Sequence, residues 1–160
     1  MSHGISESLL ETFTLIWDMY ADAINGISDD HWRSGEIDYL IPARLMLHAI
    51  VTTDFYSSPT PKEFRPLHNF KVDRKTASSD QLPSKAQMMH YYEEVKAKTM
   101  SWLKSMEDTE LLSPESEFPW TGSTVLGRVL YLLAHCRQHF GELNAELRRR
   151  GLPRIKWKTF

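Results

Sequence analysis

The stretch STVLGRVLYLLAHCRQHFGELNAELRRRG, residues 123–151, decides the fold that we expect of this chain. Its apolar residues recur at intervals of three and four, the period of a helix with one buried face. This predicted core stripe consists of Val125, Val129, Leu132, Cys136, Phe140, Leu143 and Leu147. Ser123 or Thr124 suits the N-cap, and Gly151 after three arginines suits the C-terminal end. The stretch therefore predicts one long amphipathic helix.

Three other segments carry the same period, at about residues 5–27, 42–56 and 84–106. In the first, the apolar stripe consists of Leu9, Phe13, Ile16, Trp17, Tyr20 and Ile24. Pro42 suits the first turn of the second, because a helix leaves the N–H groups of its first turn unpaired. No segment is typical of a β-sheet. Four long helices in 160 residues predict an all-α four-helix bundle, which we expect to form a single domain over residues 1–160.

The connections differ in length. About 25 residues with three prolines and no clear period separate the second and third helices, within residues 58–82. Long connections of this kind are uncommon and tend to be functional covers or mobile segments. We therefore expect a bundle with a long crossover connection instead of a simple up-down-up-down order. Residues 111–122 are expected to be a shorter loop, in which PWTG forms a turn.

Composition narrows the class of protein. The formal net charge is -2, which gives no overall electrostatic case for a nucleic-acid partner. The basic run RRRGLPRIKWK at 148–158 is interpreted as a helix end rich in cations, with nucleic-acid binding as a minor alternative. No apolar run approaches the roughly 18 residues of a membrane span, and no signal-peptide pattern is visible at residues 1–13. With a single cysteine, Cys136, the expectation is a cytoplasmic protein.

Two histidines of the fourth helix, His135 and His139, are candidate metal ligands. Residues four apart lie about 40° apart around a helix, so both imidazoles point the same way. Their angular positions place His139 just outside the core stripe and His135 further round, at the rim of the bundle. A pair with this spacing is also common as two exposed or hydrogen-bonded imidazoles, and two ligands hold a metal poorly.

His48 is the best candidate for a third ligand. It shares a predicted core-facing side of the second helix with Ile41, Leu45, Thr52 and Phe55. The other histidines lie near a terminus, in turns or loops, or beside a core stripe: His3, His31, His68 and His90. Three neutral imidazoles leave a coordination position open, which is typical of a catalytic metal site. Asp54 lies about 240° from His48 around the helix, so it is not expected to support that imidazole.

The stretches HCRQHFGELNAELRRRGLP (135–153) and SDDHWRSGEIDYLIPARLMLHAIVTTDFY (28–56) resemble the two markers of the DinB/YfiT-like superfamily of metal-dependent enzymes. The resemblance covers roughly residues 9–157. It implies a four-helix bundle with a long crossover, a metal site formed by His48, His135 and His139, and frequent homodimers. Glu142 departs from the family pattern, which commonly has glutamine there. It is interpreted either as a group that orients an imidazole or as a solvated surface glutamate.

The sequence leaves two reactions open for such a metal site, hydrolysis and transfer to a thiol. HCRQH has Cys136 where HExxH proteases have their general base, and no GxSxG or phosphate-binding loop is present. Cys136 lies in the core stripe and is expected to be an inert buried thiol. A three-histidine ion, zinc or nickel, can activate water for hydrolysis or stabilise an external thiolate. The working hypothesis is a thiol-dependent S-transferase acting on small electrophiles, because no protein base is evident and a thiolate needs none. The family resemblance implies the same, since characterised members of that superfamily include enzymes that use low-molecular-weight thiols. The alternatives are a metal-dependent hydrolase and a non-catalytic, stress-induced bundle.

Overall fold

The computed structural model describes residues 4–160, so His3 lies outside the described residues. Its helices are α1 (Ile5–Gly26), α2 (Asp29–Trp32), α3 (Pro42–Tyr56), α4 (Lys85–Ser105), α5 (Asp108–Leu111) and α6 (Val125–Arg149). Three short 3₁₀ turns join them: η1 (Asp38–Leu40), η2 (Ser79–Gln81) and η3 (Pro119–Thr121). The described chain contains no β-strand, only an isolated bridge between Pro114 and Thr124. The prediction of an all-α fold is confirmed.

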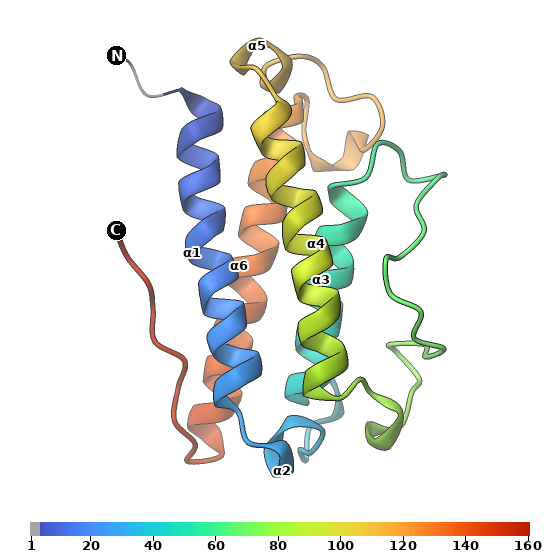
Figure 1. The fold of residues 1–160 in the computed structure, drawn as a ribbon, viewed down its shortest axis with the longest axis vertical. Coiled ribbons are helices and arrows are strands. Elements are labelled where there is room, and N and C mark those ends of the chain that lie inside the picture. The colour runs from blue at the N-terminus through green and yellow to red at the C-terminus, as the bar shows by residue number, and fades with distance from the viewer. Residues whose placement is uncertain (1–3) are drawn as a thin grey trace.

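The four long helices pack side by side as a bundle (Figure 1). α3 packs against both α4 and α6, and α1 packs mainly against α4. The segment from residue 57 to residue 84 leaves the end of α3 and returns along the outside of the bundle to the start of α4 (Figure 1). As a result α3 and α4 run in the same direction, while α1 and α6 run in the opposite one. This segment is the predicted long crossover, and we call it the crossover.

Local signals in the sequence set the helix ends. The Ser84 side chain accepts a hydrogen bond from the backbone N–H of Gln87 at 3.3 Å, and Thr124 accepts one from Gly127 at 3.2 Å. At the end of α6, Gly151 has a φ of 68°, and its N–H donates to the carbonyl of Arg148. Glycine adopts this left-handed conformation without a steric cost, so the helix stops where the sequence predicts.

The predicted stripes of α1 and α6 form the centre of the core. Every member of the α1 stripe is buried, and in the α6 stripe only Val125 is half-buried. Burial of one apolar face on each helix is what orients it about its own axis. Because Cys136 and Phe140 point into the core, the neighbouring positions 135 and 139 are fixed at the edge of the interface between α6 and α3.

The predicted face of α3 is partly wrong. Ile41 and Leu45 are buried, but from His48 onward that side is half-buried, including Thr52 and Phe55. The second half of α3 instead turns other residues into the core, among them Leu47, Ile50, Thr53 and Asp54. The hydrophobic pattern missed this side because two of its members are polar and become buried with hydrogen-bonding partners.

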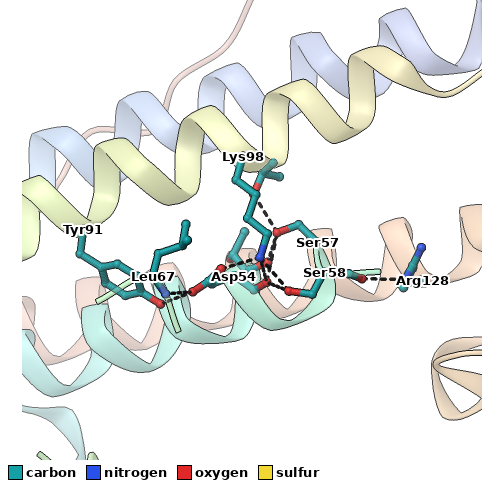
Figure 2. Close-up of polar contacts among 9 residues, drawn as sticks. Asp54, Ser57, Ser58, Leu67, Tyr91, Lys98 and Arg128 are labelled. Atoms are coloured by element: carbon teal, nitrogen blue, oxygen red, sulfur yellow. Dashed lines mark hydrogen bonds and ion pairs between the residues drawn. The ribbon is translucent and has the colours of Figure 1, made fainter. Parts of the chain in front are cut away.

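Asp54 is the centre of a buried polar network that joins α3, α4 and the crossover (Figure 2). Its carboxylate is fully buried and accepts hydrogen bonds from Lys98 Nζ at 2.7 Å and from the Tyr91 hydroxyl at 2.9 Å. The backbone N–H of Leu67, in the crossover, donates to the same carboxylate at 2.9 Å. Burial raises the pKa of the Tyr91 hydroxyl well above its ordinary value. The partners of the carboxylate come from α4 and the crossover and do not include His48, as predicted, and the carboxylate fixes the crossover to the bundle.

Two short helices were not predicted. His31 was expected in a turn, but it lies in α2, and its Nδ1 contacts Arg150 Nη2 at 2.9 Å. Residues 112–122 are a loop as expected, with η3 at the PWTG turn, but Leu111, the first residue of the predicted loop, is the last residue of α5. Along residues 4–160, no helix combines the length and the apolar character needed to cross a membrane.

Candidate metal centre

The structure brings the three predicted ligand residues together. His48 Nε2, from α3, lies 3.3 Å from His135 Nε2, and His139 Nε2 lies 3.0 Å from the same atom. One ring nitrogen from each residue lies within 4.8 Å of the other two. Zinc bonds imidazole nitrogen at about 2.0–2.1 Å, and a tetrahedral arrangement then separates two ligand nitrogens by about 3.3 Å. The spacing of the cluster therefore fits a single ion between the three rings.

Glu142 supports one of the rings. Its Oε2 lies 2.7 Å from His139 Nδ1, three residues earlier on α6. A carboxylate is an acceptor only, so His139 carries its proton on Nδ1 and turns the lone pair of Nε2 toward the other two histidines. Of the two interpretations of Glu142, the structure favours the one in which it orients an imidazole.

His135 is held as a neutral ring. Burial, together with His139 and Arg74, lowers the pKa of His135 to about 4. Its Nδ1 is buried without a hydrogen-bonding partner among residues 4–160. The Nε2 of an imidazole carries either a proton or a lone pair, so His135 Nε2 cannot both donate to His139 and accept from His48. A cation between the rings would use the three Nε2 lone pairs at once, so the donor set fits a metal better than a hydrogen-bonded trio.

His48 is contacted by Arg74, a residue of the crossover, whose Nη1 donates to His48 Nδ1. The backbone around Arg74 is fixed by Arg44, a buried residue of α3. Arg44 donates to the carbonyl of Arg74 through Nη1 and to the carbonyl of Ala77 through Nη2, both at 2.5 Å. It also pairs with Asp38 at 3.1 Å. The crossover is thus held against the histidine cluster and covers one of its rings.

Two cavities open on the cluster. One, of about 380 Å³, is lined by charged and polar residues together with Leu45: Asp38, Tyr39, Arg44, His48, Arg74, Lys75, His139 and Glu142. The other, of about 480 Å³, has a more aromatic wall: His48, Val51, Thr52, Phe55, Tyr56, Phe64, Arg74, Tyr131 and His135. We call them the charged cavity and the aromatic cavity. In the part of the chain that the structure describes, the cluster has three members, so a fourth position would face these cavities.

Among residues 4–160, the histidines outside the cluster have other partners. His68 stacks on Phe70 and accepts a hydrogen bond from its backbone N–H at 3.1 Å. Burial lowers the pKa of His68. His90 is exposed and lies 3.9 Å from Glu94. The three histidines chosen from the sequence are thus the ones that the structure brings together. Nothing in the sequence indicated Arg44 and Arg74, because the crossover has no period from which contacts can be inferred.

No model of a known protein family matches this chain, and a search of curated proteins gives no match either. The resemblance to the DinB/YfiT-like superfamily thus stays a prediction. What the structure shows is an all-helical chain with four long helices and a cluster of three histidines that could hold a metal ion.

Replacing Glu142 by alanine is expected to lower the affinity for zinc roughly 10-fold, because His139 would lose the acceptor that fixes its proton on Nδ1. Zinc affinity is measured by competition with a chromophoric chelator. Glu93→Ala, at an exposed position of α4, is the matched control and should bind zinc like the wild type. Equal affinities for the Glu142 and Glu93 variants would show that Glu142 is a surface residue without a role in the site.

Proposed function

We propose that this chain is a metal-dependent enzyme that joins a low-molecular-weight thiol to a small electrophile. The observation that carries the proposal is the convergence of three Nε2 atoms, at 3.0 and 3.3 Å, beside two cavities. A purely structural zinc site has four protein ligands. Three imidazoles with open space beside them are the arrangement that leaves room for a substrate.

The carboxylates at the cluster favour thiol chemistry over hydrolysis. Activation of water benefits from a carboxylate that can accept its proton. Of the two carboxylates that line the charged cavity, Glu142 is bonded to His139 and Asp38 is paired with Arg44. A thiol needs less help, because its ordinary pKa is much closer to neutral than that of water. An ion held by His48, His135 and His139, zinc or nickel, would supply positive charge that favours the thiolate at neutral pH.

The chain's own residues then hold the reactants. Phe55, Tyr56, Phe64 and Tyr131 give the aromatic cavity a wall suited to an apolar or aromatic electrophile. The thiol releases its proton to solvent, its sulfur bonds to the electrophilic carbon, and the leaving group departs with the electron pair of the broken bond. His135 is uncharged at neutral pH, because its pKa is lowered to about 4. It therefore offers a lone pair to the ion without first losing a proton.

The test begins with untagged protein, whose metal content is measured. Zinc-loaded protein is then mixed with glutathione or cysteine and a chlorodinitrobenzene, and formation of the thioether and chloride is followed. We expect a rate above that of the same mixture without protein, and the loss of this excess after metal removal.

Each other result selects an alternative. A zinc-loaded protein that forms no thioether but cleaves an activated ester would be a metal-dependent hydrolase. A protein that takes up neither zinc nor nickel would be a non-catalytic bundle.

A further inference from the structure

Arg74 occupies a position that conflicts with the metal. For His48 to bind an ion through Nε2, its single proton must sit on Nδ1. A guanidinium has only donors, so Arg74 Nη1 can bond to Nδ1 only when that nitrogen is unprotonated. The hydrogen bond from Arg74 and the coordination of an ion by His48 therefore exclude each other. When the ion binds, the Arg74 side chain has to leave His48.

The guanidinium released in this way stands beside both cavities, because Arg74 lines each of them. Lys75, the next residue, lines the charged cavity and is exposed, and its ammonium pairs with no carboxylate among residues 4–160. The two carboxylates that line this cavity are already used by Arg44 and His139. Asp73 does not line it, and its carboxylate accepts the backbone N–H of Lys75 at 2.8 Å. Arg44 itself is committed to the crossover backbone. The charged cavity would then hold two cations without counter-charges.

We propose that Arg74 and Lys75 form a carboxylate-binding subsite next to the histidine cluster, which becomes available when His48 holds the metal. This inference rests on the proposed function in one respect, namely that the cluster binds an ion, and it names the chemistry of the second group that the site accepts. An arginine beside a lysine suits a small organic carboxylate, which the guanidinium can bind with two parallel hydrogen bonds.

The subsite couples the two ligands. Metal binding frees Arg74 for the carboxylate, and by linkage the carboxylate raises the affinity for the metal by the same factor. We expect this factor to be roughly 10-fold, within the usual range for coupled sites. The structure also fixes the sign of a second effect. Removing the Arg74 guanidinium should raise zinc affinity when no carboxylate is present, since the competing hydrogen bond and a nearby positive charge disappear together.

The experiment measures zinc affinity by chelator competition in the presence of succinate or of its neutral analogue succinamide, with the chelator calibrated in each. We expect succinate, and not succinamide, to tighten zinc binding by the wild type roughly 10-fold. Arg74→Met should bind zinc more tightly than the wild type without succinate and show no succinate effect. Lys75→Met leaves the Arg74 contact in place, so it should change zinc affinity little on its own and weaken the succinate effect. Arg65→Met, an exposed arginine of the crossover that lines neither cavity, is the matched control.

Three results would overturn the subsite. An undiminished succinate effect in Arg74→Met would mean that the carboxylate coordinates the ion directly. The absence of any succinate effect in a wild type that binds zinc would reject the subsite and leave the proposed function standing. A wild type that binds no zinc would reject both. Thermal melting of each variant without metal shows whether the variant is folded. If Arg74→Met does not fold, Lys75→Met still tests the subsite.

Discussion

Replacing His135 by alanine is expected to lower the affinity for zinc more than about 100-fold, beyond the largest losses seen when a group that only supports a ligand is removed. His135 Nε2 is the atom that lies close to both other ring nitrogens, at 3.0 and 3.3 Å, so its loss leaves two imidazoles on separate helices. A ligand that binds only the folded state at 100 times its dissociation constant raises the free energy of unfolding by about 2.7 kcal/mol. This zinc-dependent stabilisation should disappear in the variant, and so should thioether formation.

The control for this variant is His90→Ala. His90 is an exposed histidine of α4 whose partner is Glu94, so its removal tests whether any histidine affects zinc binding. Chelator competition and calorimetric melting with and without zinc provide the two measurements. If His135→Ala bound zinc as tightly as His90→Ala, the three-histidine cluster would not be the zinc site.

Replacing Asp54 by alanine is expected to lower the free energy of unfolding by about 3 kcal/mol, at the lower end of the cost of breaking a buried ion pair. The loss leaves Tyr91 without its acceptor and the Leu67 N–H without the bond that fixes the crossover. Lys98 keeps partners in Ser58 and a backbone carbonyl, and its side chain is 25% exposed, which moderates the cost. Urea unfolding followed by circular dichroism measures the difference.

Two further variants separate the ion pair from the rest of the network. Lys98→Met removes the cation alone, and the double variant with Asp54→Ala should cost less than the sum of the single changes, because the two side chains interact directly. Asp18→Ala, at an exposed position of α1, should change stability by less than about 0.5 kcal/mol. Additive effects of the two single changes would mean that Asp54 and Lys98 do not stabilise each other.

The long helices could be predicted because their signals are local. The period of α6, the cap at Thr124 and the glycine at 151 are all contained in the segment that they shape. The shared direction of His135 and His139 could be predicted for a related reason, since the position of a histidine around its helix follows from the helical repeat. His48 was chosen for a side of α3 that is half-buried in the structure. The crossover could be predicted only as a connection, since its length implied that the bundle is not a simple up-down-up-down one without implying any of its contacts.

Apart from the short helices α2 and α5, the failures of sequence reasoning involve polar groups buried with partners far away in the chain. Asp54 is buried because Lys98 and Tyr91 arrive from α4, and Arg44 because the crossover offers it backbone carbonyls. Hydrophobic periodicity treats such residues as surface positions. For the same reason it assigned the half-buried side of α3 to the core. The position of Arg74 beside His48 depends on the hydrogen bonds from Arg44 to the crossover, and no local sequence pattern predicts it.

The parallel course of α3 and α4 interlocks the two halves of the chain. A protease that cut once near Arg65, an exposed residue of the crossover, would leave α1 and α3 on one fragment and α4 and α6 on the other. Because α1 packs on α4 and α3 packs on both α4 and α6, each fragment supplies the apolar surface that the other buries. The nicked protein should stay assembled. Separated fragments should recombine. Zinc should favour their association, because one fragment supplies the imidazole of residue 48 and the other supplies those of residues 135 and 139.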